Sequence, residues 1–341
     1  MRKIKVLIVD DSLVFREILS RGISSDSNIH VISTAVNPFE ARDKIIEYKP
    51  DVITCDIEMP KMNGIEFVRR LMPQYPLPVI VVSALSDAVF SAMNAGAVDF
   101  VAKPDVSSAK SVEAFINEMI IKIKIASIAN VSQQKTRKAM QSIVEGTGAE
   151  KENRIIAIGA STGGTEAIYS ILSSLPYDMP GIVIVQHIPP GFSKMFADRL
   201  NNTTKFSVKE AQTGDFVEAG KVLVAPGDSH IRIKKLGTRF RVECFKGEKI
   251  NGHCPSVDIL FESIAKEAGN QAIGIILTGM GYDGAKGILS MRRKGARTIG
   301  QDDKSSVVYG MPKVAFDIGG VEKQAPLNDI PQLIYSMLIS K

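Results

Sequence analysis

The feature that most constrains the fold of this chain is a repeated alternation of short apolar runs with amphipathic segments. In the first part of the sequence, buried strands are expected at residues 5–9, 30–35, 52–55, 78–82 and 98–102. Helices are expected at 13–21, 38–47 and 111–126, with Ser12 as a suitable N-cap and Pro38 at a permitted early position. Strands that alternate with helices form a parallel sheet covered on both faces, so residues 1–125 are expected to form a doubly wound α/β domain with a five-stranded parallel sheet.

A second alternation begins at Arg154. Strands are expected at 155–158, 181–185 and 273–277, and helices near 166–174, 193–200, 256–268, 285–294 and 330–338. Between them, the runs at 221–224, 229–234 and 238–245 predict a strand-rich insert with a turn at Gly237. Residues 154–341 are therefore expected to form a doubly wound α/β/α sandwich with a mainly parallel sheet and an antiparallel hairpin.

The segment at 126–153 differs from both alternating regions. It contains the polar stretches QQKTRK and EGTGAE and has little apolar periodicity, which is typical of a linker between domains. A length of 341 residues accommodates two domains. The sequence thus predicts a domain at 1–125, a linker at 126–153 and a second domain at 154–341.

Composition and charge argue against several classes of protein. The net charge of +5 is not concentrated on one element and the chain has no Trp, so nucleic-acid binding is not indicated. The three cysteines, Cys55, Cys244 and Cys254, show no CxxC spacing, which argues against a disulfide framework or a zinc site. The basic start is followed by too short an apolar run for a signal peptide, and no run approaches the ~18 apolar residues of a membrane span. We therefore expect a cytoplasmic protein that does not insert into membranes.

Acidic side chains follow the first and third predicted strands. Asp10 and Asp11 end the first strand, Asp56 ends the third, Ser83 ends the fourth, and Lys103 follows the fifth. Ligands of open α/β sheets bind at the carboxyl ends of the strands, so these five side chains are expected to gather there. Three carboxylates in one pocket repel each other and favour a bound cation, and hard oxygen ligands suit Mg²⁺.

This cluster has the groups needed for phosphoryl transfer to a carboxylate. Asp56 is the candidate nucleophile, Lys103 and the metal would balance the charge of the phosphoryl oxygens, and Ser83 would donate a hydrogen bond to the attached phosphate. The alternative is that these aspartates are ordinary turn formers and helix caps, which is the better explanation for Asp10 taken alone. The complete set at successive strand ends favours the phosphoacceptor site.

Residues 1 to about 125 resemble a response-regulator receiver domain, which has a flavodoxin-like fold. The motif DIEMPKMNG at 56–64 adds to the resemblance. It implies that a histidine kinase donates phosphate to Asp56, and that Asp10, Asp11 and Asp56 bind Mg²⁺ with help from a backbone carbonyl near Glu58. It also implies that Ser83, Phe100 and Lys103 act in the switch and that the Lys103–Pro104 peptide is cis.

The motif GASTGG at 159–164 lies between a predicted strand and a predicted helix. A G-x-S-x-G pattern in this context is typical of a nucleophile elbow that exposes Ser161. Backbone amides at the helix start, including that of Thr162, are candidate oxyanion donors. The alternative is a glycine-rich phosphate cradle, although the G-x-G-x-x-G and Walker lysine patterns are absent. The motif alone leaves both possibilities open.

Two further strand ends supply the partners that a serine nucleophile needs. His187 follows the strand at 181–185, and histidine is a suitable general base because it ordinarily titrates near pH ~6.5. Asp283, in TGMGYDG at 278–284, is the candidate to orient His187, and the Met280 amide is a second oxyanion donor. Taken alone, Asp283 is more simply explained as the cap of the next helix. The remaining histidines, His30, His230 and His253, fit the role of the base less well.

GASTGG, QHIPP, NGHCPSVD and TGMGYDG resemble motifs of the chemotaxis protein-glutamate methylesterases, and the order of domains extends the resemblance to nearly the whole chain. It implies that Ser161, His187 and Asp283 hydrolyse glutamate methyl esters on the cytoplasmic helices of chemoreceptors and deamidate certain receptor glutamines. No cofactor is implied for ester hydrolysis. NGHCPSVD is expected to shape the substrate cleft without a catalytic role.

The same resemblance implies that the unphosphorylated receiver domain covers the catalytic cleft and that phosphorylation of Asp56 relieves this inhibition. A transcriptional regulator would instead need a helix-turn-helix after the linker, and none is found. A nucleotide-binding domain and an adaptor with an inactive triad are the alternatives that remain open at this level.

Overall fold

The computed structural model describes residues 2–84, 88–131 and 154–339. Contacts divide the chain into two units, Met1–Gln133 and Gln134–Lys341. The linker expected at 126–153 falls mainly on residues that the structure does not describe, so its boundaries stay a prediction. None of the described helices combines the length and apolar character that a membrane span requires.

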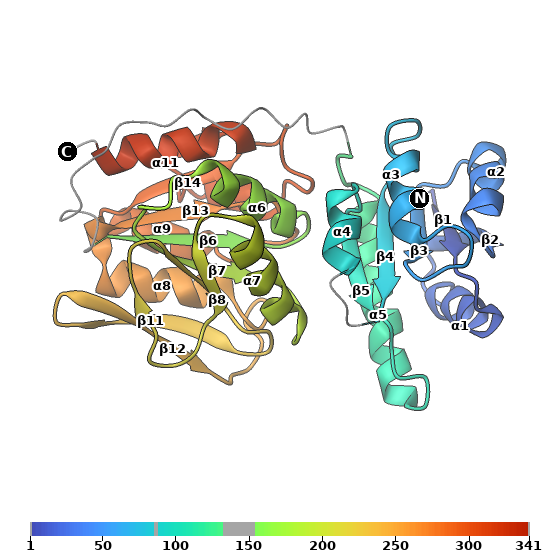
Figure 1. The fold of residues 1–341 in the computed structure, drawn as a ribbon, viewed down its shortest axis with the longest axis horizontal. Helices are drawn as coiled ribbons and strands as arrows, with labels where there is room; N and C mark the ends of the chain where they lie inside the picture. Colours follow the sequence, from blue (N-terminus) through green and yellow to red (C-terminus); the bar gives the residue numbers. More distant parts are fainter. Residues whose placement is uncertain (1, 85–87, 132–153, 340–341) are drawn as a thin grey trace. The chain divides into compact units, whose positions relative to one another are not determined.

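The first unit is built on a five-stranded sheet in which every neighbouring pair of strands is parallel. The order is β2-β1-β3-β4-β5, as expected for the flavodoxin-like fold (Figure 1). The strands are β1 (Ile4–Val9), β2 (Ile29–Ala35), β3 (Val52–Asp56), β4 (Val79–Ser83) and β5 (Asp99–Ala102). Because β3 and β4 are covered on both faces, all their residues are buried, and this is why they appear in the sequence as continuous apolar runs.

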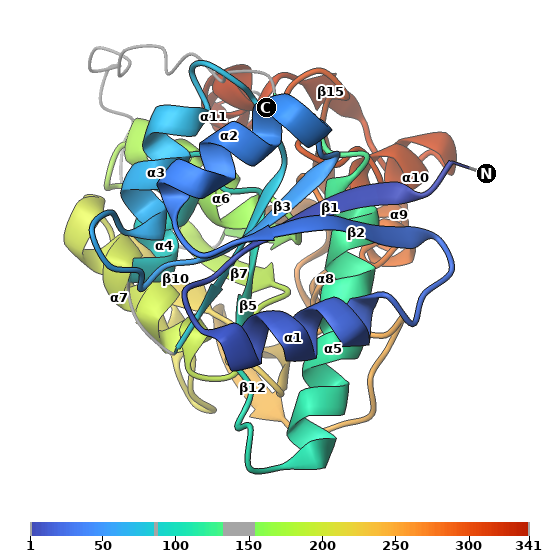
Figure 2. The ribbon, with the colours of Figure 1, turned by 90° about the vertical axis from the view of Figure 1, so that its right-hand side faces the viewer.

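Helices cover both faces of this sheet. On one face α1 (Leu13–Ile23) packs against α5 (Ala109–Ala126), and on the other lie α2 (Pro38–Tyr48), α3 (Gly64–Leu71) and α4 (Ala88–Asn94) (Figure 2). Ser12 caps α1 as predicted, since its hydroxyl accepts a hydrogen bond from the Phe15 amide. The short helices α3 and α4 were not anticipated, because eight and seven residues carry little periodic signal.

The second unit contains a seven-stranded sheet of order β15-β14-β13-β6-β7-β10-β8, again with only parallel pairs. Its strands are β6 (Ile155–Ala160), β7 (Gly181–Gln186), β8 (Ser207–Glu210), β10 (Lys221–Val224), β13 (Ala272–Ile276), β14 (Arg297–Gln301) and β15 (Lys323–Ala325). The sequence assigned 221–224 to the insert, and this was wrong. Three of the four residues of β10 are buried, and the strand pairs with β7 inside the main sheet.

Helices pack on both faces of this sheet (Figure 1). One face carries α8 (Val257–Glu267), α9 (Ala285–Arg293) and α10 (Met311–Asp317). The other face carries α6 (Gly164–Ser174), α7 (Phe192–Thr203) and α11 (Ile330–Ile339). The arrangement confirms the predicted α/β/α sandwich. Single-turn 3₁₀ helices lie at Gly269–Gln271 and Leu327–Asp329.

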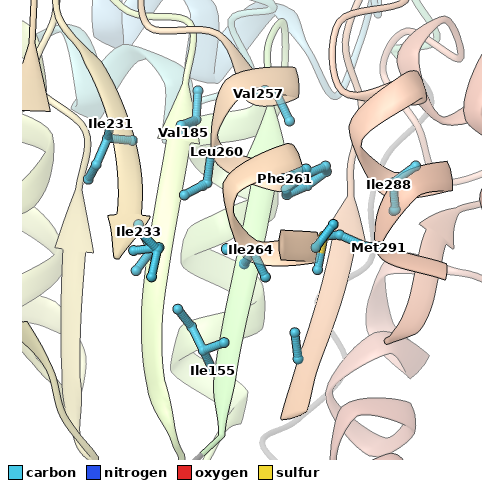
Figure 3. Close-up of a cluster of buried hydrophobic side chains, with 14 of the residues drawn as sticks. Ile155, Val185, Ile231, Ile233, Val257, Leu260, Phe261, Ile264, Ile288 and Met291 are labelled. Atoms are coloured by element: carbon cyan, nitrogen blue, oxygen red, sulfur yellow. The ribbon is translucent and has the colours of Figure 1, made fainter. Parts of the chain in front are cut away.

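A smaller antiparallel sheet, of order β11-β12-β9, packs against α8. It consists of β9 (Phe216–Val217), β11 (His230–Leu236) and β12 (Arg239–Phe245), and the predicted turn at Gly237 has the positive φ of 61° that glycine tolerates. Figure 3 shows α8 between the two sheets, with Leu260 facing Ile231 of β11 and Val185 of β7. This apolar core fixes the start of α8 near the carboxyl ends of the main-sheet strands.

Candidate functional sites

In the first unit, the predicted acidic residues gather at the carboxyl ends of the strands. One oxygen from each of Asp10, Asp11 and Asp56 lies within 4.8 Å of the others. The Lys103 ammonium donates a hydrogen bond to Asp56 Oδ2 at 2.6 Å and lies 4.0 Å from Asp10 Oδ2. Asp10 and Asp56 are buried and Asp11 is exposed. The structure therefore confirms that the four charged groups predicted from the sequence lie close together.

The electrostatics of Asp10 fit a bound cation. Burial raises the pKa of its carboxyl to about 6, and the charges of Asp56 and Asp11 add to the rise, against the lowering effects of the Ser12 amide and Lys103. Asp10 Oδ2 is buried and, among the residues that the structure describes, accepts no hydrogen bond. Mg²⁺ prefers oxygen ligands such as carboxylates. Three clustered carboxylates, one with a buried oxygen that accepts no hydrogen bond, therefore fit the expected ion.

The remaining predicted receiver residues lie on β4, on β5 and in the loop after Asp56. Ser83 lies at the end of β4, and within the described part of the chain its buried hydroxyl has no hydrogen-bond partner. Phe100 in β5 is buried, with its ring edge-on to Phe90 at a centroid distance of 6.3 Å. The Glu58 amide donates to Asp56 Oδ1 at 3.2 Å. Gly64 leaves room for the loop after Asp56, because a Cβ there would overlap the Asp56 carbonyl oxygen.

One expectation for this site was wrong. The Lys103–Pro104 peptide is not cis, since Cys254–Pro255 is the one cis bond among the described residues. The trans form is the intrinsically preferred state of an X–Pro bond, and Lys103 reaches Asp56 in that state.

In the second unit, three neighbouring strands deliver the predicted catalytic residues to one edge of the sheet. The order β13-β6-β7 places the loops after these strands side by side. Ala160 pairs in register with Gln186, so Ser161 and His187 directly follow adjacent strand ends. The Ser161 amide donates to the Thr278 carbonyl at 3.0 Å, which ties the loop after β6 to the loop after β13.

The loop that carries Ser161 is tightly constrained. Gly163 begins the turn into α6 with a φ of 77°, and a Cβ on Gly279 would lie 2.7 Å from Ser161 Cβ. Gln186 donates through Nε2 to the carbonyls of Ser161, at 2.9 Å, and His187, at 3.2 Å. Gln186 thus ties the segments of Ser161 and His187 together, a role that sequence reasoning did not anticipate.

His187 and Asp283 are joined by a hydrogen bond of 2.9 Å between Nε2 and Oδ2. The His187 side chain is 7% exposed, and its Nδ1 is buried without a hydrogen-bond partner among the described residues. With the Nε2 proton donated to Asp283, Nδ1 carries the lone pair. In the part of the chain that the structure describes, no hydrogen bond joins the Ser161 hydroxyl to His187. The basic nitrogen is therefore Nδ1, whereas the familiar triad template uses Nε2.

Asp283 is the centre of a hydrogen-bond network. Its Oδ1 accepts from Asn251 Nδ2 at 2.8 Å, from Ser256 Oγ at 2.8 Å and from the Asp258 amide at 3.3 Å. Its Oδ2 accepts from the Val257 amide at 2.7 Å besides His187. Burial alone would raise the pKa of Asp283, but its hydrogen bonds, and the charge that His187 carries when protonated, outweigh burial and hold that pKa below its ordinary value. Asp283 is therefore a carboxylate at neutral pH.

These bonds revise the alternative role considered for Asp283. It does not cap the following helix α9, because its carboxylate bonds to other partners and the Gly287 amide of α9 donates to Asp258 instead. It instead accepts the first amides of α8, where a negative charge interacts favourably with the helix dipole.

The two predicted oxyanion donors lie on loops beside Ser161. Thr162 follows it directly and is buried, with its carbonyl accepting from Thr278 Oγ1 at 3.0 Å. Met280 follows Gly279, which packs on Ser161, and is 42% exposed. Their role as amide donors stays a prediction.

Sequence reasoning missed His253. Its ring stacks on that of His187 with centroids 3.6 Å apart and an interplanar angle of 7°. Burial, followed by the charge of His187, lowers the pKa of His253 to about 4. The Asn-Gly pair at 251–252 is typical of a tight turn, so the sequence could have predicted a turn here. It could not show that this turn lies against His187.

The lowered pKa of His253 predicts a pH dependence of stability. As the pH falls below about 6.5, the unfolded chain protonates this histidine, whereas the folded chain does so only near pH 4. The unfolded state binds more protons in this window, so stability should fall with pH. The free energy of unfolding, measured with urea, should decrease more between pH 7 and pH 5 for the wild type than for His253→Phe. Equal losses in the two proteins would contradict the prediction.

Comparisons with known proteins agree with this architecture. Residues 156–334 match a family model described as CheB methylesterase, and residues 6–113 match one described as response regulator receiver domain. A protein of Syntrophomonas wolfei subsp. wolfei named "Protein-glutamate methylesterase/protein-glutamine glutaminase 2" is 58% identical over 340 residues, covering 99% of this chain and 98% of that protein. A protein-glutamate methylesterase/protein-glutamine glutaminase of Escherichia coli (strain K12) is 44% identical over 337 residues, covering 97% and 96%.

Among solved structures, the CheB methylesterase catalytic domain of Thermotoga maritima is similar to the second unit. The sequence identity is 38% and the TM-score 0.53, and the match covers 54% of this chain and 98% of that domain.

Proposed function

Since this chain belongs to the family of CheB methylesterases that carry a receiver domain, we propose that it removes methyl groups from glutamate methyl esters by a Ser161-His187-Asp283 mechanism. The membership confirms the resemblance inferred from the motifs. The observation that supports the mechanism best is the 2.9 Å bond between His187 and Asp283 at the sheet edge where Ser161 also lies. The substrates would be cytoplasmic helices of methyl-accepting chemoreceptors, and receptor glutamines would be deamidated at the same site.

Acylation begins with the hydroxyl of Ser161. Its proton moves to Nδ1 of His187 as Oγ forms a bond to the ester carbonyl carbon. Asp283 stabilises the resulting imidazolium through the Nε2 hydrogen bond. The amides of Thr162 and Met280 would donate to the oxyanion that develops on the carbonyl oxygen.

The tetrahedral intermediate then breaks its bond to the methoxy oxygen. The proton on Nδ1 of His187 passes to that oxygen, and methanol leaves. Water attacks the acyl-enzyme, again giving its proton to His187, and the glutamate carboxylate departs as Ser161 regains its proton. With a glutamine side chain the same steps release ammonia.

We also propose that phosphorylation of the receiver domain, at residues 1–125, relieves its inhibition of the catalytic domain at 154–341, to which the linker at 126–153 joins it. A chemotaxis histidine kinase would be the phosphodonor and Asp56 the acceptor. Lys103, 2.6 Å from Asp56, would balance the added charge, and the hydroxyl of Ser83 would donate to the phosphoryl group. Phe100 would respond as the switch aromatic.

Asp10, Asp11 and Asp56 would hold the Mg²⁺ that this phosphorylation requires. When bound, the ion neutralises charge on the phosphoryl oxygens. The combined activity would serve adaptation in chemotaxis, since demethylation resets receptor signalling after a stimulus.

The experiment that tests the function is methanol release from methylated chemoreceptor membranes, with and without acetyl phosphate and Mg²⁺. The phosphodonor should raise the rate for the wild type by on the order of tenfold, the usual size of an allosteric coupling. Asp56→Ala should keep the basal rate and lose the activation. Asp43→Ala is the matched control, because Asp43 is exposed and, within the described residues, pairs only with Arg42.

Activation of Asp56→Ala equal to that of the wild type would exclude the proposed switch. Absence of methanol under every condition, with folded protein and intact receptor, would exclude the esterase function.

A further inference from the structure

The segment Ile250–His253 forms a tight turn beside the catalytic pair. The Ile250 amide donates to the His253 carbonyl at 3.0 Å, and the His253 amide donates to the Ile250 carbonyl at 2.9 Å. The two central residues, Asn251 and Gly252, have φ angles of 53° and 85°. Two consecutive positive φ angles are the mark of a type I′ turn, for which Asn-Gly is the preferred sequence. The turn therefore holds Asn251 and His253 in a fixed relation.

Both residues touch the catalytic pair. Asn251 Nδ2 donates to Asp283 Oδ1 and to Asp258 Oδ2, each at 2.8 Å, and so anchors the turn between two buried carboxylates. The ring of His253 lies parallel to that of His187 at 3.6 Å. One turn therefore contacts both members of the pair: His253 contacts His187, and Asn251 contacts Asp283.

The ring plane of His187 needs support beyond one hydrogen bond. A single bond at Nε2 leaves the imidazole free to tilt about that contact, and Nδ1 has no hydrogen-bond partner among the described residues that could prevent it. A flat ring stacked at an interplanar angle of 7° restricts this tilt directly.

The charge state of His253 suits this role. Burial and the charge of His187 lower the pKa of His253 to about 4, with Lys249 adding to the lowering and Asp283 opposing it. At neutral pH the ring is therefore uncharged, and a neutral aromatic face tolerates the positive charge that His187 acquires during the reaction. A positive charge on His253 would repel the charge that His187 acquires.

We propose that His253 is a positioning residue whose ring fixes the plane of the His187 ring and so keeps Nε2 on Asp283. This inference rests on the proposed function, because it takes His187 as the base. His253 itself exchanges no proton with the substrate.

The first test compares His253→Ala with His253→Phe in the phosphodonor-activated full chain. The alanine variant should lower kcat for methanol release by about 10- to 100-fold, as expected for a misplaced catalytic group, with little change in KM. The phenylalanine variant restores a flat ring and should recover most of kcat. Wild-type kcat in His253→Ala, or a folded His253→Phe as slow as the alanine variant, would overturn the proposal. Should His253→Ala unfold, His253→Leu fills the volume without a flat ring and should be equally slow.

A second readout needs no substrate and so separates this proposal from the proposed function. The chain has four histidines, and their ring nitrogens can be assigned by ¹⁵N NMR through single replacements. The wild type and His253→Phe should show His187 as the Nε2–H tautomer, whereas His253→Ala should show a mixture of tautomers. An unchanged tautomer in His253→Ala would overturn the positioning role even if the wild type released no methanol.

Discussion

Replacing Ser161 by alanine is expected to reduce methanol release from methylated chemoreceptors by a factor on the order of 10⁴ or more, the loss usual for the nucleophile of a serine triad. In the proposed mechanism, the Ser161 hydroxyl is the protein group that forms the covalent bond to the substrate. The fold should be unaffected, because the contacts that fix this loop come from the backbone of residue 161 and from Gly279.

The measurement is the rate of methanol release with acetyl phosphate and Mg²⁺, together with thermal unfolding of each variant. Ser174→Ala is the matched control, because the one hydrogen bond of the Ser174 hydroxyl in the described part of the chain is to the Ser170 carbonyl of α6. It should keep the wild-type rate. A Ser161→Ala protein that retained a tenth of the activity would exclude Ser161 as the nucleophile.

Asp283→Asn is expected to lower kcat by a factor on the order of 10⁴, because the amide cannot hold His187 in the productive tautomer. If the new NH₂ group replaces Oδ2, Nε2 must accept its hydrogen bond, and the proton of His187 then occupies Nδ1. The nitrogen that should remove the proton of Ser161 is no longer basic.

The opposite orientation of the new amide group in Asp283→Asn would lower the stability of the protein. The NH₂ group would then face the Asn251 amide and the Asp258 amide, which are both donors. Each buried donor left unpaired costs about 1–3 kcal/mol, so the variant should also be less stable than the wild type. The prediction therefore joins a loss of rate with a lowered unfolding temperature.

Assays of Asp283→Asn should be run at a temperature at which circular dichroism shows the variant to be folded. Asp317→Asn, at the exposed end of α10, makes the same chemical change without these contacts and should match the wild type. A folded Asp283→Asn with normal kcat would show that Asp283 does not orient the base.

The strand ends explain why so much of both sites could be predicted. Parallel strands buried on both faces leave a continuous apolar signal, and the residue after each such run must lie at one edge of the sheet. That reasoning located Asp56 at the end of β3 and Ser161 after β6 from local sequence alone. Strands β8, β14 and β15 were missed because they are short and contain polar residues, and their pairing depends on neighbours far along the chain.

The contacts around Asp283 lay beyond sequence reasoning for a different reason. The sequence places Asp283 before α9 and therefore suggests a cap for that helix. Its carboxylate is instead directed to the start of α8, which the packing of α8 between two sheets brings close. The same holds for His253, since a local Asn-Gly signal predicts a turn but not the ring against which the next residue stacks.

The order of the seven-stranded sheet also bears on how the protein resists aggregation. Its two outer strands, β15 and β8, are three and four residues long, and each carries an exposed lysine, Lys323 and Lys209. Short, charged edges offer little template for pairing with the backbone of another chain. The long apolar strands are confined to the interior of the sheet, where both of their neighbours are already in place. The edges that discourage such pairing thus lie at the two margins of the sheet, whereas the proposed catalytic residues follow its central strands β13, β6 and β7.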